Sequence, residues 1–223
     1  MTVAAIIPAK SLALAKSRLS AVLSPAGRAT LAGAMLRDVA EAALACPRVD
    51  TVIVVCADPR AADLVGPLGA RVLRVPGDRG YTAAACEGLA VAAAEGFATA
   101  VVLPGDIPLI DAETLARLLA AHEEGGGLTL VPDRRHAGTN AFVSSPPGRM
   151  LPAFGPDSFA RHVALARAAG IDAHTLPLPA IGLDIDVADD LDRLRGTPGA
   201  ARHTRACLAT LQGALAAERG VSP

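Results

Sequence analysis

The chain has 223 residues and a formal net charge of −1, from 21 Lys and Arg against 22 Asp and Glu. This length fits one sizeable domain or one domain with a small appendage, and without a long basic block a broad nucleic-acid surface is not expected. The chain opens without a charged n-region, and no apolar stretch reaches the roughly 18 residues that a membrane span needs. We therefore expect a cytoplasmic protein with neither nucleic acid nor membrane as a partner.

Apolar runs alternate with helical patterns along the chain, which predicts an α/β fold with a mostly parallel sheet. The expected strands cover residues 3–7, 51–56, 70–75, 99–103, 128–131, 140–144 and 173–178. The expected helices cover residues 25–45, 59–68, 82–94, 112–121, 158–169, 188–195 and 200–217, the last with a frayed end. This pattern indicates a main domain over residues 1–196 and a C-terminal helical extension over 197–223.

A cationic loop follows the first expected strand. Lys10, Lys16 and Arg18 lie within nine residues of one another, directly after Pro8 and Ala9. Such a run is often solvated surface, but its position after the first strand of an α/β pattern favours phosphate binding. The loop has no Gly-Lys-Ser/Thr sequence and is not a Walker motif.

Two short acidic segments, 103–108 (Leu-Pro-Gly-Asp-Ile-Pro) and 183–186 (Leu-Asp-Ile-Asp), each follow an apolar run. We interpret both as the carboxyl ends of strands, where α/β sheets bind ligands. Asp184 and Asp186 should share one face of an extended backbone. Together with Asp106 they are candidate ligands for Mg²⁺, which prefers carboxylate oxygens. Asp189 and Asp190 are interpreted as charges at a helix N-terminus.

Polar residues in two later segments could bind a second substrate. Thr139 and Asn140 end a polar loop between two expected strands, and Gly155 and Ser158 lie at the start of an expected helix. A helix start with a free hydroxyl suits an anion, although an ordinary cap would look the same. His162, on the same helix, is expected to be structural or exposed rather than catalytic.

Six short motifs occur together in a specific order. They are 8–10 (Pro-Ala-Lys), 15–19 (Ala-Lys-Ser-Arg-Leu), 105–108 (Gly-Asp-Ile-Pro), 138–141 (Gly-Thr-Asn-Ala), Phe154-Gly155 with Ser158-Phe159, and 183–186 (Leu-Asp-Ile-Asp). Over about residues 3–196 this order resembles the guanylyltransferases of deazaflavin coenzyme (coenzyme F-420) biosynthesis. The resemblance implies a three-layer α/β/α Rossmann-like nucleotidyltransferase fold, of the nucleotide-diphospho-sugar transferase type.

The resemblance also implies a reaction: GTP and a small three-carbon phosphoacid give a guanosine-diphospho-linked acid and pyrophosphate. The acceptor in such enzymes is phosphoenolpyruvate, 2-phospho-L-lactate or 3-phospho-D-glycerate. The product would pass to a downstream deazaflavin-coenzyme transferase, and exposed Ala/Leu-rich helix faces would permit a homodimer.

The resemblance implies roles for individual residues as well. Thr139, Gly155 and Ser158 match acceptor-binding positions, and Asp106 with Asp184 or Asp186 matches the Mg²⁺ site. The nucleotide-binding positions are Pro8, Ala9, Lys10, Lys16, Asp78, Gly80 and Thr82, and the catalytic cations are Lys10, Lys16 and Arg18.

This chain departs from the family pattern in three places, of which the change from Ala-Asp-Leu-Pro to Gly-Asp-Ile-Pro at residues 105–108 is mild. Gly80-Tyr81-Thr82 stands where the family usually has a Gly-Leu-Asn-type turn, which looks like the contact to the base. Arg134, Arg135 and His136 precede the Gly-Thr-Asn motif, and their charge could favour a more anionic or longer acceptor.

Two other functions agree less well with the sequence. A molybdopterin or sugar-phosphate nucleotidyltransferase is disfavoured because its usual Gly-Gly-x-Ser/Ala-x-Arg-Met-Gly opening is absent from the sequence. A nucleotide-binding regulatory protein without catalysis is disfavoured because all three candidate metal carboxylates are retained.

Overall fold

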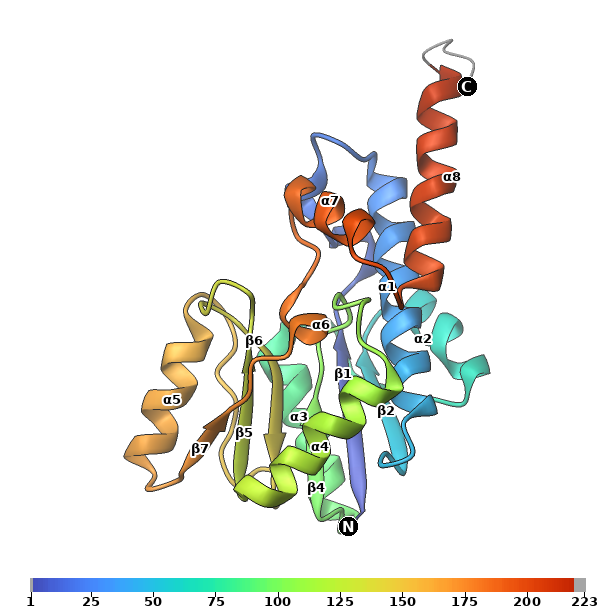
Figure 1. Cartoon of the computed structure of the whole chain (residues 1–223). Helices are drawn as coiled ribbons and strands as arrows, with labels where there is room; N and C mark the ends of the chain where they lie inside the picture. The colour runs from blue at the N-terminus through green and yellow to red at the C-terminus, as the bar shows by residue number, and fades with distance from the viewer. Residues whose placement is uncertain (1, 219–223) are drawn as a thin grey trace.

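A mixed, mostly parallel sheet forms the centre of the protein (Figure 1). The computed structural model describes residues 2–218, and within them seven strands pair in the order β3-β2-β1-β4-β6-β5-β7. The strands are β1 Val3–Ala9, β2 Thr51–Cys56, β3 Arg71–Arg74, β4 Thr99–Val102, β5 Leu128–Pro132, β6 Thr139–Ser144 and β7 Ala173–Thr175. Among the strands of the described residues, only β6 runs antiparallel to its neighbours β4 and β5.

Helices cover both faces of this sheet. They are α1 Pro25–Ala45, α2 Pro59–Val65, α3 Tyr81–Ala94, α4 Ala112–Gly125, α5 Ser158–Ala168, α6 Pro179–Gly182, α7 Ala188–Gly196 and α8 Arg202–Glu218. One apolar core joins the sheet to α1, α2 and α4, and a second joins its other face to α3 and α5. The predicted three-layer α/β/α fold is confirmed.

The central strands are apolar on both faces because both faces are covered. Ile6 and Ile7 of β1, for example, are fully buried on opposite sides, one in each core. Parallel pairing of β1 with β4 places Ile6 beside Val102, so both strands end at the same edge of the sheet. The loops after β1 and β4 therefore emerge side by side, at the end of the sheet opposite the N-terminus (Figure 1).

The structure corrects several predicted bounds. The helix expected over 59–68 ends at Val65 and continues as a 3-10 turn, Gly66–Leu68, where Pro67 lacks the amide hydrogen that an α-helix needs. The strand expected over 173–178 ends at Thr175, two residues before the next proline. The frayed end predicted for the last helix lies outside the described residues.

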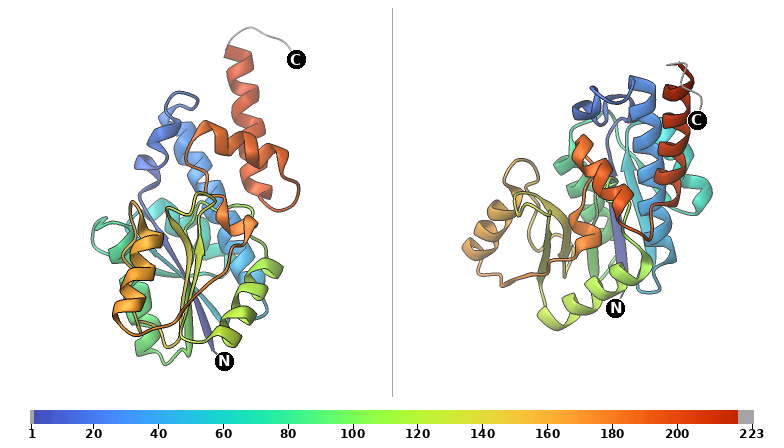
Figure 2. Two further views of the ribbon diagram at one scale, coloured as in Figure 1. Left: turned by 60° about the vertical axis from the view of Figure 1, so that its left-hand side comes forward. Right: turned by 45° about the horizontal axis from the view of Figure 1, so that its top comes forward.

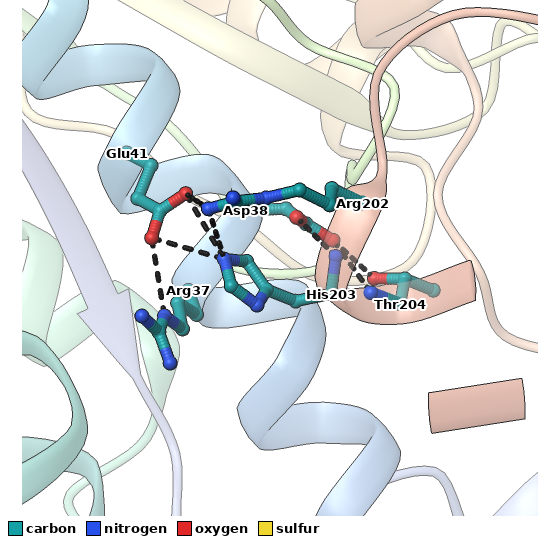
Figure 3. Close-up of polar contacts among 6 residues, drawn as sticks. All are labelled: Arg37, Asp38, Glu41, Arg202, His203 and Thr204. Carbon is teal, nitrogen blue, oxygen red and sulfur yellow. Dashed lines mark hydrogen bonds and ion pairs between the residues drawn. The ribbon is translucent and has the colours of Figure 1, made fainter. Parts of the chain in front are cut away.

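Helix α8 packs alongside α1, as the right view of Figure 2 shows. Asp38 of α1 receives hydrogen bonds from the amides of His203 and Thr204 and from the Thr204 hydroxyl, at 2.9, 2.8 and 2.6 Å (Figure 3). This carboxylate thus binds free amides in the first turn of α8. Beside it, His203 and Arg202 contact Glu41 (Figure 3). No helix within residues 2–218 has the length and apolar character required to cross a membrane.

Replacing Asp38 by Ala should lower the free energy of unfolding by about 1–2 kcal/mol, because the start of α8 loses its cap. Thermal denaturation followed by circular dichroism measures this. Thr210→Ala is the matched control, because this exposed hydroxyl on α8 donates only to the carbonyl of Ala206 within the same helix. Equal melting temperatures for the two variants would contradict a structural role for the cap.

Candidate active site

The cationic loop after β1 folds into two short 3-10 turns, Leu12–Leu14 and Ser17–Leu19. Lys16 lies between them with φ 56° and ψ 40°, a left-handed conformation that is uncommon for a residue with a side chain. Its side chain points inward and is only 7% exposed, whereas the side chain of Arg18 is 71% exposed. Lys10 is exposed just past the end of β1.

Asp58, which the sequence did not single out, holds this loop in place. Its Oδ2 accepts hydrogen bonds from the Leu12 amide at 2.9 Å and the Ser11 hydroxyl at 3.4 Å. A hydrogen bond from the Arg60 guanidinium lowers the pKa of Asp58 to about 2, so the carboxylate stays charged at neutral pH. The Asp-Pro pair after β2 could have drawn attention to Asp58, but this pair predicts only a helix cap. Asp58 does cap α2 as well.

The acidic residues reach the site in two different ways. Asp106 lies in the loop that follows β4, at the predicted end of this strand. Asp184 and Asp186 do not follow a strand: they lie on an extended link between α6 and α7, which corrects the strand-end interpretation. The predicted alternation holds, because Ile185 between them is fully buried. The amide of Ile185 donates to the carbonyl of Asp106 at 3.0 Å and joins the two acidic segments.

Lys16 bridges two of these carboxylates. Its Nζ lies 2.5 Å from Asp106 Oδ2 and 2.9 Å from Asp186 Oδ1, and Arg18 lies 3.5 Å from the other oxygen of Asp186. Burial alone would lower the pKa of Lys16, but the charges of Asp106 and Asp186 outweigh it, so the pKa is raised. Lys16 is therefore a fixed positive charge at neutral pH.

Asp184 is in a different electrostatic environment. Burial, followed by the charge of Asp106, raises the pKa of its carboxyl group above the usual value. The amide group of Asn140 donates to Asp184 Oδ1 at 3.3 Å and to the carbonyl of Ile181 at 2.9 Å. Both contacts use its Nδ2, so Asn140 holds the acidic link in place. Asn140 also lines the cleft described below, and its contact with substrate stays a prediction.

The chemistry of these groups fits Mg²⁺, which is often held by one or two carboxylates together with substrate phosphates. Asp106 and Asp186 face the same point, and Asp184 is close enough for its pKa to respond to both. Across residues 2–218, however, no three Asp, Glu, His or Cys side chains are grouped closely enough to hold a metal ion by themselves. Mg²⁺ coordination by all three carboxylates stays a prediction.

A second group of polar residues lies where β6 begins and α5 starts. The Thr139 amide donates to the Ser158 hydroxyl at 3.0 Å, which joins the first residue of β6 to the first residue of α5. Gly155, with φ 132°, forms the turn before α5. Thr139, Gly155 and Ser158 all line one cleft, and their predicted contact with the acceptor stays a prediction.

Two adjoining clefts contain most of the predicted residues. The first, here called the cation cleft, has a volume of about 340 Å³ and is lined by Pro8, Ala9, Lys16 and Arg18 among others. The second, the hydroxyl cleft, has a volume of about 470 Å³ and contains Thr139, Asn140, Gly155, Ser158 and Asp184. Both are lined by the same five residues, here called the shared wall: Lys10, Tyr81, Pro104, Asp106 and Asp186.

Three of the predicted nucleotide-binding residues lie on or just after the loop that follows β3, and they do not line the cation cleft. Gly80 and Thr82 line the hydroxyl cleft rather than the cation cleft. Asp78 lines neither: its carboxylate accepts from the Gly80 amide at 2.9 Å and shapes the loop. A direct contact of Asp78 with the nucleotide stays a prediction.

The order and placement of these residues agree with a match to known sequences. A family model described as "Guanylyl transferase CofC like" matches residues 3–221. The chain belongs to this guanylyltransferase family. The prediction of a nucleotidyltransferase of the guanylyltransferase type is confirmed.

Relatives in this guanylyltransferase family cover nearly the whole chain. Phosphoenolpyruvate guanylyltransferase from Conexibacter woesei is 38% identical over 213 residues, which covers 93% of this chain and 96% of the relative. 3-phospho-D-glycerate guanylyltransferase from Phenylobacterium zucineum is 37% identical over 205 residues, covering 89% and 91%. A solved structure, described as a putative nucleotide-diphospho-sugar transferase from Desulfovibrio desulfuricans G20, has a TM-score of 0.77 at 16% identity and 96% coverage of both chains. That last likeness concerns the fold alone.

The family match corrects the expected extent of the resemblance. The match continues past Gly196, where the expected resemblance ends, and includes α8. Leu208 of α8 shares an apolar cluster with Met35 of α1 and with Leu194 of α7. In this guanylyltransferase, therefore, α8 packs as part of the body, although a domain boundary near residue 196 is not tested by the match.

Two side chains of this guanylyltransferase site were not predicted from the sequence. Tyr81 lines both clefts, yet its hydroxyl is buried and has no hydrogen-bond partner among the described residues. Burial, with a smaller effect from Asp106, raises its pKa well above the usual value, so the hydroxyl keeps its hydrogen. His162 is fully buried behind Thr139. In the sequence, Tyr81 stands out only as a departure from the family turn, and His162 is expected to be structural or exposed rather than catalytic.

The basic residues before the Gly-Thr-Asn motif do not all add charge to the hydroxyl cleft. Arg134 pairs with Asp190 at 2.7 Å and with Asp189 at 3.4 Å, at the start of α7. The Asp190 carboxylate also accepts from the amides of Asp186 and Val187, which confirms its predicted place at a helix start. Because the charge of Arg134 is balanced there, it gives no support to a more anionic acceptor.

Proposed function

We propose that this protein transfers GMP from GTP to the phosphate of a small three-carbon phosphoacid and releases pyrophosphate. The acceptor would be phosphoenolpyruvate, 2-phospho-L-lactate or 3-phospho-D-glycerate, and the product an intermediate of deazaflavin coenzyme (F-420) biosynthesis. One observation carries the proposal: a cleft lined by cations and a cleft lined by hydroxyls adjoin at a shared wall that contains Asp106. The names of the relatives from Conexibacter woesei and Phenylobacterium zucineum support it.

The proposed reaction requires little proton transfer. An oxygen of the acceptor phosphate, already an anion at neutral pH, attacks the α-phosphorus of GTP. A new phosphorus–oxygen bond forms, the bond from the α-phosphorus to the bridging oxygen breaks, and pyrophosphate leaves with that electron pair. Because no general base is needed, the chief task of the protein is to bring two anions together and to stabilise the leaving group.

The cation cleft suits the triphosphate. Lys16 presents a fixed positive charge that two carboxylates hold in place, and the exposed Lys10 and Arg18 extend the field along the cleft. Asp106 and Asp186, with Asp184 nearby, are the residues that would hold Mg²⁺. When bound, Mg²⁺ would supply positive charge to the triphosphate oxygens. The hydroxyl cleft, on the other side of the shared wall, would place the acceptor for in-line attack.

A panel assay tests the proposed function. Pyrophosphate release is measured with GTP and Mg²⁺ in the presence of each of the three acids, and the products are identified by mass spectrometry. We expect release with at least one acid and a product mass equal to the acid plus GMP. Release with a phosphosugar but with none of the acids, or tight GTP binding without turnover, would overturn the proposal.

Replacing Tyr81 by Phe should lower kcat/KM by about tenfold and leave the melting temperature unchanged or slightly higher. A buried hydroxyl without a partner costs free energy in the free protein, and a substrate that accepts its hydrogen would recover about 1.4 kcal/mol on binding. Initial rates and thermal denaturation of the same samples measure both effects. If the rate is unchanged, the hydroxyl makes no contact with either substrate.

Three further parts of the proposal are expectations from the sequence alone. They are a homodimer, a cytoplasmic location, and transfer of the product to a downstream deazaflavin-coenzyme transferase. Analytical ultracentrifugation at micromolar protein concentration tests the first of them.

A further inference from the structure

His162 has a position that no step of the proposed reaction uses. Its ring is fully buried on α5, between the aromatic rings of Phe142 and Phe154, with ring centroids 5.4 and 5.1 Å away. Both ring nitrogens nevertheless have partners: Nε2 lies 2.8 Å from the amide nitrogen of Ala153, and Nδ1 lies 2.9 Å from the hydroxyl oxygen of Thr139.

The first of these contacts fixes the proton on the ring. A backbone amide can only donate, so Nε2 of His162 must accept the hydrogen bond from Ala153 and carry no hydrogen. The hydrogen of the neutral ring is therefore on Nδ1. Burial, with the charge of Arg161, lowers the pKa of His162 to about 4, which agrees with a neutral ring at physiological pH. A protonated ring would direct a second N–H at the Ala153 amide.

The second contact then fixes the hydroxyl of Thr139. Because His162 Nδ1–H donates to Thr139 Oγ1, the hydrogen of that hydroxyl must point elsewhere. Ser158 is in the same situation, since its oxygen receives the Thr139 amide at 3.0 Å. Both residues line the hydroxyl cleft, so two neighbouring hydroxyls are left with one hydrogen each to donate. Two neighbouring hydrogen-bond donors suit a carboxylate or phosphate.

We propose that His162 is a positioning residue, which orients the Thr139 hydroxyl as a hydrogen-bond donor to the anionic acceptor and so determines the affinity for that substrate. The proposal rests on the proposed function, because it takes the occupant of the hydroxyl cleft to be the phosphoacid. His162 does not touch the acceptor and takes no part in proton transfer to it.

Variants of His162 separate this role from a purely structural one. Gln can reach the Ala153 amide in place of Nε2 but loses the donor to Thr139, whereas Asn can keep a donor near the position of Nδ1. We expect His162→Gln to raise the KM for phosphoenolpyruvate, or for whichever acid is turned over, by about tenfold, with the KM for GTP changed less than about twofold. His162→Asn should recover most of the loss. Leu165→Ala, an exposed position on the same helix, is the control.

A double-mutant cycle tests whether the effect passes through Thr139. In a Thr139→Val background, His162→Gln should raise the acceptor KM by no more than about twofold, because the hydroxyl it orients is already gone. An acceptor KM that stays constant in His162→Gln while the melting temperature falls would overturn the proposal. So would an equal rise in the KM values for GTP and acceptor.

Nitrogen-15 NMR of the histidine-labelled wild type gives a test that needs no variant. The expected result at pH 7 is the tautomer with hydrogen on Nδ1 for His162, with a shift of the Nδ1 resonance when the acceptor is added. A ring that is protonated on Nε2, or charged, at this pH would overturn the proposal. Failure of the wild type to turn over any of the three acids would instead contradict the proposed function, so the two failures are distinguishable.

Discussion

Asp106→Asn is expected to abolish turnover, with pyrophosphate release reduced by about 10³-fold or more while the fold is kept. Asp106 lies in the shared wall and its carboxylate is 2.5 Å from Lys16 Nζ. Asn has the same shape but no charge, so it can neither neutralise the ammonium group nor bind Mg²⁺ with a full negative charge. The fold should survive because the link from Ile185 uses the backbone carbonyl of residue 106, which the substitution leaves in place.

Rates across a range of Mg²⁺ concentrations measure this effect, alongside thermal denaturation. Any residual activity should require more Mg²⁺ than the wild type does. Asp192→Asn removes a carboxylate of the same kind from an exposed surface pair with Arg195 and should leave the rate unchanged. A near-normal rate in Asp106→Asn would remove this residue from the metal site.

Much of the fold could be predicted because local rules and tertiary packing agree in this chain. Ser24 caps α1 through its side chain and Pro25 occupies the first helical position, and both residue types favour the helix start expected at residue 25. Continuous apolar runs such as 51–56 became strands covered on both faces. The cations after β1 and Asp106 after β4 could be placed together because parallel neighbouring strands end at one edge.

The second acidic segment shows where such reasoning ends. Alternation of Asp184, Ile185 and Asp186 predicts a shared face in any extended backbone, and that face is observed. Alternation does not reveal whether the backbone belongs to a strand. Here the link is fixed by hydrogen bonds from distant parts of the chain, including the Ile185 amide to Asp106 and Asn140 to Asp184. Pairings over such separations are not visible in one sequence.

The same limit applies to the choice of hydrogen-bond partners. Asn140 was predicted to bind substrate, because an amide near an expected cleft can serve either the ligand or the protein. His162 is expected from the sequence to be structural or exposed, because a histidine on a helix gives no sign of what its ring nitrogens contact. In both cases the residue type shows which hydrogen bonds the side chain can make. Which groups it contacts depends on how α5 and α6 pack around β6.

Lys16→Met is expected to lower turnover by about 10²–10³-fold and to raise the KM for GTP. The ammonium group holds Asp106 and Asp186 together, and it is the one cation of the loop whose side chain is nearly fully buried. Without it two carboxylates face each other and the triphosphate loses a fixed positive charge. The unfolding free energy should fall by only about 1–2 kcal/mol, since the side chains of Asp106 and Asp186 are 30% and 40% exposed and water can solvate them.

The pKa shift gives this prediction a pH dependence with a definite sign. The pKa of Lys16 is raised above its ordinary value of 10.5. Its contribution to stability is therefore fully present below pH 10.5 and is lost only as the pH rises through the higher folded pKa. The stability difference between wild type and Lys16→Met should be constant from pH 6 to 9, and chemical denaturation at several pH values measures it.

A Mg²⁺ titration of the melting temperature separates the two roles of Lys16. The unopposed carboxylates of Lys16→Met should bind Mg²⁺ more tightly, so Mg²⁺ should raise the melting temperature of this variant more than that of the wild type. Arg48→Met, which removes a cation from an exposed pair with Glu123, should show neither this effect nor the loss of turnover. If Lys16→Met keeps full activity, the charge that stabilises the leaving pyrophosphate must come from Lys10 and Arg18, and the buried ion pair serves only to shape the loop.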